Sequence, residues 1–410
     1  MRKVAWLLLL LFAFTIPWEV SLNLGEPWGN AARIAGILVL LAAVPAVFQA
    51  GQMRAPCAFN WITLALFLWF CASCFWSVDI AASLVKLRAY FQEMTIVWLI
   101  WEFADTPDDL GNLLRATVAG SWVLAILTLA AFYSPDSLAA DQIRFAAYGE
   151  DPNDVARFLD LSFPLAALLV HSERRGLMRA LAIGFLPVGI IAVLLTASRS
   201  GFLAALVALA GSIFILVHGH ARRAAAAVFV LPPFLIALWF FIPGATLERL
   251  ATIPDQLQGG DLNQRVNIWS AGWDAFTRAP LSGSGVGTFV AAAHAAPMDS
   301  AHNTVLSILV SGGLVALFLA SLLVAMALRA AFRTHGPLRL SLVTCLVVWA
   351  ITTFIASVEE NRTTWLFLGV TLLAARLSDE NPSDLAACFR LAPPQRAHDP
   401  SPALAVEPSS

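Results

Sequence analysis

The chain has few charged residues for its length. Only 13% of its 410 residues are Asp, Glu, Lys or Arg, whereas a soluble domain carries about 25%. The basic residues number 25 and the acidic residues 27. The basic ones fall between apolar runs instead of gathering on one face, which excludes a nucleic-acid-binding surface. The five cysteines are scattered and have no histidine cluster beside them, so they predict neither a disulfide framework nor a metal site.

Apolar sequence is what the chain has in abundance. Hydrophobic residues make up 59% of it, and they gather in runs of about 20 residues, the length that crosses a bilayer as a helix. The sequence therefore predicts an all-α, polytopic transmembrane helical bundle of about twelve spans. The predicted spans lie at residues 4–17, 34–50, 58–76, 89–104, 116–133, 155–170, 180–197, 201–217, 224–242, 302–328, 340–357 and 363–376.

The distribution of basic residues predicts the orientation of these spans. If the N-terminus is cytoplasmic, most of the basic residues lie on that side, among them Arg2, Arg54 and Arg376, as the positive-inside rule requires. The chain then divides into spans 1 to 9, one large outer (periplasmic) loop with short helices, spans 10 to 12, and a disordered cytoplasmic tail. These four parts cover residues 1–242, 243–301, 302–376 and 377–410.

Two arginines lie at the predicted outer boundary of the membrane, where burying a charge is costly. Arg199 lies in Thr196-Ala-Ser-Arg-Ser-Gly201, beside a helix N-terminus that Ser200 can cap, and a cation next to free backbone N–H groups favours an anion. Arg265 begins an amphipathic helical run with an aromatic face, which we expect along the membrane surface. The alternative to anion binding is that Arg199 only anchors its hairpin to lipid headgroups. For Arg265 the alternative is an ordinary solvated surface charge.

A histidine occupies a similar boundary position later in the chain. His302 and Asn303 come just before the apolar run Val305–Ala327, so a rigid helix end would hold the imidazole at the outer face. A neutral imidazole there can accept a proton from a hydroxyl group. The alternative is that His302 only caps the helix.

Other polar sequence near the outer face is less specific. Lys86 and Arg88 could add phosphate contacts or could simply reach the lipid headgroups, and Arg157 is spaced to pair with Asp160 on one helix face. The glycine-rich run Gly283–Phe289 lacks the Lys and Ser/Thr of a P-loop, so we interpret it as a turn.

Taken in order, these motifs resemble the O-antigen ligase family, which includes O-antigen and exopolysaccharide polymerases. The resemblance depends on four runs: Ser198-Arg-Ser-Gly, Arg265 with Ile268-Trp, Pro280-Leu-Ser-Gly-Ser-Gly-Val-Gly-Thr-Phe, and His302-Asn before Ser311-Gly-Gly-Leu. The chain departs from the family in lacking an acidic residue shortly before that last Gly-Leu.

The resemblance implies a GT-C-like glycosyltransferase of the bacterial inner membrane, acting in lipopolysaccharide or polysaccharide biosynthesis without a metal or other cofactor. It would take a glycan from undecaprenyl pyrophosphate on the periplasmic face, by an inverting reaction. Arg199 and Arg265 match the family's pyrophosphate-binding arginines and His302 its catalytic histidine, with four further residues as secondary candidates. Those four are Lys86, Arg88, Arg157 and Asn303.

The residues leave two questions open. The acceptor is the lipid A core in a ligase, a second lipid-linked glycan in a polymerase, or more remotely a protein, and acceptor choice would depend on the outer loop. A different class, a transporter or flippase of lipid-linked glycans, would also place cations near a pyrophosphate. A flippase should line a deep cavity with charge along several spans, whereas these arginines lie at span ends.

The predicted orientation can be tested by cysteine labelling. A single cysteine at Gln258, in a variant without the native cysteines, should react with a membrane-impermeant thiol reagent that has access to the periplasm, because residues 243–301 are expected there. A cysteine at Arg54 is the matched control and should stay unlabelled in intact cells. Labelling at residue 54 but not at residue 258 would reverse the topology.

Overall fold

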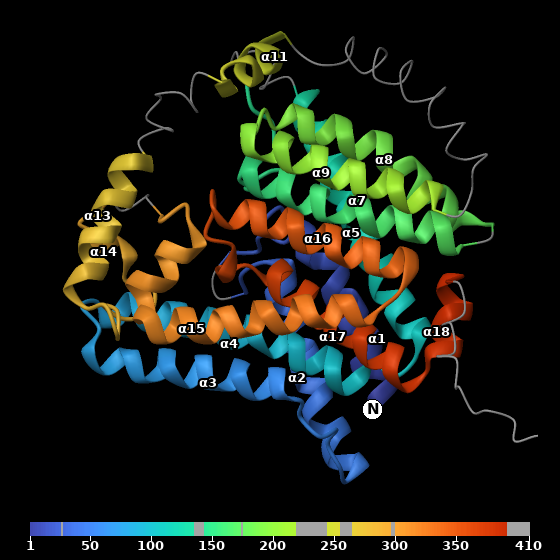
Figure 1. Ribbon diagram of the computed structural model, residues 1–410, viewed down its shortest axis with the longest axis horizontal. Helices are drawn as coiled ribbons and strands as arrows, with labels where there is room; N and C mark the ends of the chain where they lie inside the picture. Colours follow the sequence, from blue (N-terminus) through green and yellow to red (C-terminus); the bar gives the residue numbers. More distant parts are fainter. Residues whose placement is uncertain are drawn as a thin grey trace, which may run out of the picture.

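The computed structural model describes residues 1–25, 28–134, 143–173, 175–218, 244–254, 265–296 and 300–391. Over these residues the chain is helical and forms no named strand, which confirms the all-α prediction (Figure 1). Eight of the described helices are long and apolar enough to cross a membrane. The protein is therefore a multi-pass membrane protein.

The long helices coincide with the predicted spans. The eight candidate spans are α2 (Ala31–Ala50), α3 (Ala58–Ser73, with a 3-10 turn to Trp76), α5 (Pro107–Phe132), α7 (Pro152–Ser172), α8 (Leu177–Leu195), α9 (Arg199–Val217), α15 (Thr304–Arg333) and α16 (Gly336–Thr353). Three other predicted spans are also helices: α1 (Arg2–Thr15), α4 (Ile80–Phe103) and α17 (Arg362–Glu380). The predicted span 224–242 lies outside the described residues, so the number twelve stays a prediction.

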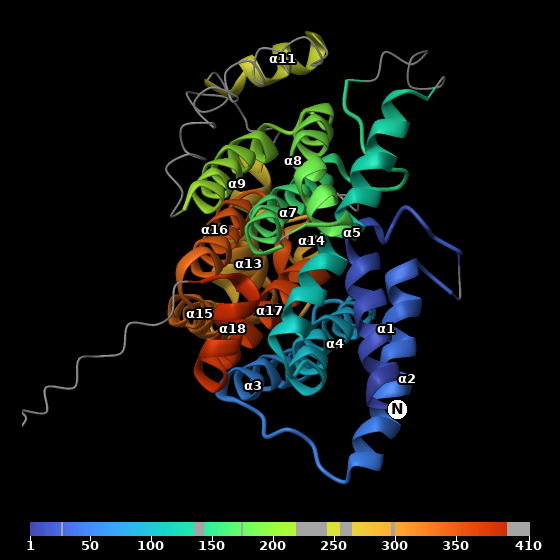
Figure 2. The same cartoon turned by 90° about the vertical axis from the view of Figure 1, so that its right-hand side faces the viewer.

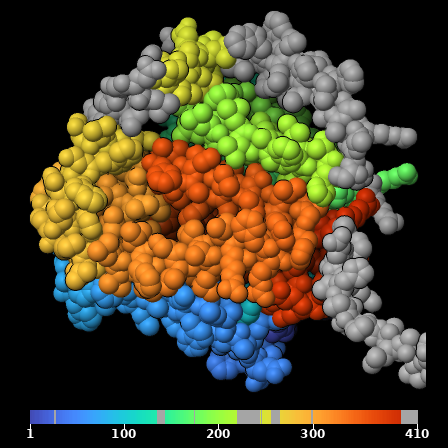
Figure 3. Space-filling view, in the orientation of Figure 1, coloured from blue at the N-terminus to red at the C-terminus, as the bar shows by residue number. Residues whose placement is uncertain are grey.

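Three short helices, α11 (Gly244–Ala251), α13 (Arg265–Arg278) and α14 (Phe289–Ala293), belong to the predicted outer loop. In Figure 1, α13 and α14 lie at one end of the long helices and α18 (Pro382–Phe389) at the opposite end. In the space-filling view the gold atoms of α13 and α14 form the left edge, and the orange atoms of α15 lie beside them (Figure 3). The predicted amphipathic helix beginning at Arg265 is thus confirmed as α13.

The C-terminal tail differs from its prediction. We expected disorder from residue 377, but α17 continues to Glu380 and α18 follows at once. Leu385 and Phe389 lie four residues apart on one face of α18, and both are buried in the main core. These two side chains give the short helix an apolar face that packs on the core. The sequence prediction missed this face because the surrounding residues are charged and rich in proline. Residues 392–410 lie outside the described part of the chain.

The helix α15 is broken near its first third. Gly313 has φ 66° and ψ −163°, a conformation that interrupts the helix. The carbonyls of Val310 and Ser311 accept hydrogen bonds from the backbone N–H groups of Ser284 (2.8 Å) and Gly285 (3.1 Å). The carbonyl of Gly312 accepts one from Trp69 Nε1 at 2.8 Å. Loop and side-chain donors thus replace the helical bonds lost at the break, as a membrane-buried backbone requires.

The same glycine-rich loop is bonded on its other side to the turn between α3 and α4. Val286 donates its N–H to Ser73 Oγ (3.0 Å), and its carbonyl accepts from Ser83 Oγ (2.7 Å). A Cβ at Gly283 would lie 2.6 Å from the nitrogen of Gly312, so the close approach needs glycine. The interpretation of this run as a turn agrees with the structure, in which the loop joins α15 to the α3–α4 turn.

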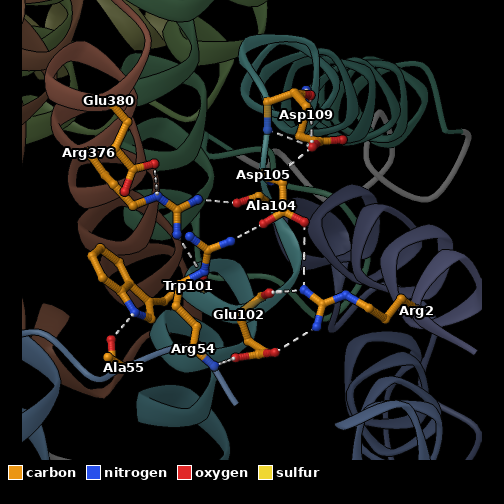
Figure 4. A network of polar contacts seen from close by, with 11 residues as sticks. Arg2, Arg54, Ala55, Trp101, Glu102, Ala104, Asp105, Asp109, Arg376 and Glu380 are labelled. Carbon is orange, nitrogen blue, oxygen red and sulfur yellow. Dashed lines mark hydrogen bonds and ion pairs between the residues drawn. The ribbon is translucent and has the colours of Figure 1, made fainter. Parts of the chain in front are cut away.

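At the opposite end of the bundle a network of ion pairs joins four segments (Figure 4). Glu102, at the end of α4, accepts from Arg2 Nη1 of α1 (2.8 Å) and from the backbone N–H of Arg54 in the α2–α3 linker (2.8 Å). Arg376 of α17 donates to the carbonyl of Trp101 (2.9 Å). The three arginines predicted to share the cytoplasmic side therefore lie at the same end of the bundle.

The break in α15 predicts a strong effect of Gly313→Ala. A Cβ at Gly313 would lie 2.2 Å from the carbonyl oxygen of Leu281, and an L-residue with this φ and ψ costs about 1–3 kcal/mol before any clash. We expect a lower midpoint of thermal unfolding for the purified protein in detergent. Gly244→Ala is the control, because a Cβ there meets no described atom within 4 Å. Equal midpoints for the two variants would contradict a structural role for the break.

Candidate functional site

The turn between α8 and α9 holds Arg199 in place. Ser198 caps α9: its Oγ accepts from the N–H of Gly201 (3.1 Å) and donates to Asn153 Oδ1 on α7 (2.8 Å). The prediction that Ser200 caps this helix is therefore wrong, because the helix begins at Arg199, two residues earlier than a Ser200 cap would allow. A Cβ at Gly201 would lie 2.3 Å from that of Ala156, so α9 packs closely on α7. Arg199 is consequently the first residue of a tightly packed helix.

Two further arginines bind the backbone of this turn. Arg144 donates from Nε to the carbonyl of Thr196 (3.3 Å) and from Nη2 to Asn153 Oδ1 (2.9 Å). Arg249, on α11, donates from Nε to the carbonyl of Ala197 (3.1 Å). Ala197 has φ 46°, the left-handed region that an alanine seldom adopts. The turn thus gathers arginines from separate segments around a strained residue.

Arg199 and Arg249 connect α9 to α11 in both directions. While Arg249 donates to the α8–α9 turn, Arg199 Nη1 donates to Thr252 Oγ1, just after α11, at 3.1 Å. Figure 1 shows α11 beside the end of α9 that carries Arg199. The helix α11 is therefore bonded to the α8–α9 turn by two arginine side chains.

Arg265 is a fourth arginine whose charge interacts with those near the α8–α9 turn. Burial lowers the pKa of Arg265, and the nearby charge of Arg199 lowers it further, while Asp151 acts in the opposite direction. The pKa of Arg144 is lowered by burial and then by Arg249, Arg199 and Arg265. Within the described residues Arg265 has no hydrogen bond or salt bridge. Positive charges that repel one another in a partly buried region favour the binding of an anion.

We call Arg144, Arg199, Arg249 and Arg265 the arginine cluster. Sequence reasoning identified Arg199 and Arg265 and missed Arg144 and Arg249. No spacing rule relates Arg144 to Arg249, because folding across about 100 residues brings them to the α8–α9 turn. The one available signal was that each is a basic residue outside a predicted span on the outer side.

The segment with His302 is attached to α13. Trp269 lies one turn after Arg265, and its Nε1 donates to the carbonyl of Ala301 (3.0 Å). Asn303 caps α15, since its Oδ1 accepts from the N–H of Leu306 (2.9 Å). The alternative of His302 as a helix cap is thus wrong. His302 has φ 44°, and its Nδ1 lies 3.3 Å from Ser300 Oγ.

Two glutamates that sequence reasoning missed lie beside the start of α15. Thr304 Oγ1 donates to the carbonyl of Ala356 (2.8 Å) and accepts from the N–H of Val358 (2.9 Å), so α15 is bonded to the segment that carries them. Burial raises the pKa of Glu359, and the adjacent charge of Glu360 raises it further. Two consecutive acids at the boundary of a predicted span were a usable signal, because a membrane boundary seldom retains charge without a reason.

The secondary candidate residues have different surroundings and do not gather at one place. Lys86 forms a salt bridge with Glu360, with 2.5 Å between Nζ and Oε2. Arg88 is exposed on α4. Arg157 pairs with Asp154 at 2.8 Å, which corrects the expected pair with Asp160: Asp154 lies toward the helix start, near the polar end, whereas Asp160 is fully buried.

Comparison with known protein families agrees with this part of the chain as the functional region. Residues 184–321 match the family model described as O-antigen ligase. The match runs from α8 into α15 and includes Arg199, Arg265 and His302, and it supports assignment to the O-antigen ligase family. No curated protein matches the chain. The family match and the spanning helices together indicate a membrane enzyme that processes glycans, a glycosyltransferase in general terms, with lipid-linked glycans as substrates.

Proposed function

We propose that this protein, part of which matches the O-antigen ligase family, is a metal-independent, inverting glycosyltransferase of the bacterial inner membrane. It transfers a glycan from undecaprenyl pyrophosphate to an acceptor on the periplasmic face. The acceptor is the lipid A core in a ligase or a second lipid-linked glycan in a polymerase. The observation that carries the proposal is the arginine cluster at one end of the spans, within the residues that match the family.

The cluster supports a pyrophosphate leaving group. As the bond between the anomeric carbon and the pyrophosphate oxygen breaks, negative charge grows on that oxygen. Fixed guanidinium groups in a partly buried site stabilise this charge more than water does, because they need no reorganisation. The start of α9, which carries Arg199, is held by the Ser198 cap and by close packing on α7, and α13, which begins with Arg265, is held by its bond to the His302 segment.

His302 is the proposed general base. It would take the proton of the acceptor hydroxyl while the hydroxyl oxygen attacks the anomeric carbon from the side opposite the leaving group, which inverts the configuration. Two features support this role: Asn303 does the capping, and Trp269 bonds the backbone next to His302 to the helix that begins with Arg265. Donor and base are thereby held in one region, which contributes a proximity effect.

A flippase of lipid-linked glycans is the second candidate. It would require charge at several depths along the spans. The arginine cluster and the network around Glu102 lie instead at the two ends of the bundle, while two acids, Glu93 and Asp160, are buried within α4 and α7. The concentration of arginines at one end favours an enzyme that acts at one membrane face.

The arginines generate the first functional prediction. Arg199→Ala or Arg265→Ala should reduce transfer by roughly 10²–10³-fold, because each removes a cation that stabilises the leaving group. Lysine should restore only part of the activity, since it lacks the planar fork of arginine. The assay uses purified protein in liposomes with lipid-linked glycan and either lipid A core or more lipid-linked glycan, and the product is sized. Arg278→Ala is the control, and full activity of both Ala variants would refute the pyrophosphate role.

The second functional prediction concerns His302. His302→Ala should reduce transfer by roughly 10²–10⁴-fold while donor binding persists, which is the usual contribution of a positioned base. His294→Ala, another left-handed histidine in the same loop, should keep its activity. EDTA should not inhibit the wild type. A fast His302→Ala enzyme, or a wild type that EDTA inactivates and Mg²⁺ restores, would exclude the mechanism.

A further inference from the structure

We propose that Tyr90, Glu93 and Glu359 form a binding site for the hydroxyl groups of a sugar, next to the start of α15. Tyr90 and Glu93 belong to α4, and Glu359 belongs to the 3-10 turn η3 (Val358–Glu360) between α16 and α17. The inference rests on the proposed function, because the sugar belongs to one of the two glycans of that reaction. It assigns glycan recognition to residues outside the arginine cluster.

The three side chains are buried and lack hydrogen-bond partners. Tyr90 is 3% exposed, Glu93 4% and Glu359 7%. Within the described residues, both carboxyl oxygens of Glu359 and Oε2 of Glu93 have no partner, and the hydroxyl of Tyr90 forms no hydrogen bond. Burying a polar group without a partner is unfavourable, so a folded protein seldom retains one without a use. Three such groups together indicate donors and acceptors that are kept for a ligand.

The fold brings these groups to one place. Tyr90 and Glu93 are three residues apart on α4 and therefore share a helix face. Tyr90 lies near enough to both Glu93 and Glu359 for their charges to act on it. Its ring is stacked on that of Phe70, with 4.8 Å between the ring centroids, so its position is fixed. The site thus combines a fixed aromatic ring with two carboxyl groups.

The neighbouring cations already have acidic partners. Lys86 pairs with Glu360 at 2.5 Å, and Arg362 pairs with Glu19. In the part of the chain that the structure describes, the two carboxyl groups of the proposed site have no such cation. A ligand that fits must therefore supply hydrogen-bond donors.

Sugar hydroxyl groups match this requirement. A hydroxyl can donate to a carboxyl oxygen and accept from the hydroxyl of Tyr90. Burial raises the pKa of Glu359, so this carboxyl group keeps a proton more readily and can also donate. The acids would repel a phosphate, and among the described residues no three His, Cys, Asp or Glu side chains gather as metal ligands. A polyhydroxyl ligand is therefore favoured over an anion or a metal ion.

The site lies beside the segment that carries the proposed base. Thr304, two residues after His302, accepts a hydrogen bond from the N–H of Val358 at 2.9 Å. Val358 precedes Glu359, and the hydroxyl of Ser307, one turn along α15, acts on the carboxyl group of Glu359. The surface is hollowed between α15 and α16 (Figure 3), which leaves space for a glycan on this side of α15. A sugar in the site would thus lie close to the reacting centre of the proposed mechanism.

The first experiment measures sugar binding by the full-length protein in detergent. One probe is core oligosaccharide released from lipopolysaccharide by mild acid, and the other is the oligosaccharide released from the donor lipid. At least one should bind, and Tyr90→Phe and Glu359→Gln should each raise its dissociation constant about tenfold, because each changes one hydrogen-bonding group at nearly constant volume. The probe that binds shows which glycan the site takes.

The same variants test a purely structural role. Tyr90→Phe removes a hydroxyl group that has no partner, so its unfolding midpoint should equal or exceed that of the wild type. Asp160→Asn is the matched control for Glu359→Gln, because Asp160 on α7 is also fully buried with both carboxyl oxygens unpartnered by any described residue. This control should leave the dissociation constant unchanged. If Glu359→Gln lowers the unfolding midpoint, Tyr90→Phe still decides.

A transfer assay in liposomes separates this inference from the proposed function. Tyr90→Phe should raise the KM for the glycan about tenfold and change kcat less than about threefold, since it removes a contact of the bound sugar. Wild-type dissociation constants in both variants, or a wild type that binds neither probe, would overturn this inference and leave the proposed function intact. A wild type that binds oligosaccharide through these residues but transfers no glycan would overturn the proposed function alone.

Discussion

The break in α15 at Gly313 is the constraint on which the candidate site depends. A helix that stops inside a membrane protein exposes carbonyls that must find donors, and here Ser284, Gly285 and Trp69 supply them. The first part of α15, which follows His302, therefore takes its direction from a loop and from a helix far away in sequence. Those donors add to the bond from Trp269 to Ala301, which holds the histidine segment against α13.

The two ends of the bundle use arginine in opposite ways. At one end, Arg2 and Arg54 are bonded to Glu102, so the charges neutralise one another and hold four segments together. At the other end, Arg199 and Arg249 bind uncharged acceptors, the hydroxyl of Thr252 and a backbone carbonyl. In the first arrangement the arginines are paired with acidic side chains, and their role is to hold the segments together. The second arrangement brings arginines of separate segments to one turn, which is the feature that the proposed function uses.

The sequence predicted most of the helices and part of the site. Apolar runs predict spanning helices because a bilayer imposes both length and hydrophobicity, and the amphipathic run from Arg265 is helical as expected. Arg199 could be singled out because its motif lies at a helix start. Arg144, Arg249 and Glu359 could not be related to it, since their neighbours come from distant segments and no local period records such contacts. Helix caps were also uncertain by one or two residues, as usual at helix ends.

The bond from Trp69 to Gly312 spans 243 residues, and this has a consequence for biosynthesis. During translation α3 is made early, while the carbonyl that its tryptophan binds belongs to a helix made more than half a chain later. Until α15 has entered the membrane, the glycine-rich loop lacks one of its two supports and the histidine lacks its helix. The nascent protein therefore spends much of its synthesis with an incomplete candidate site.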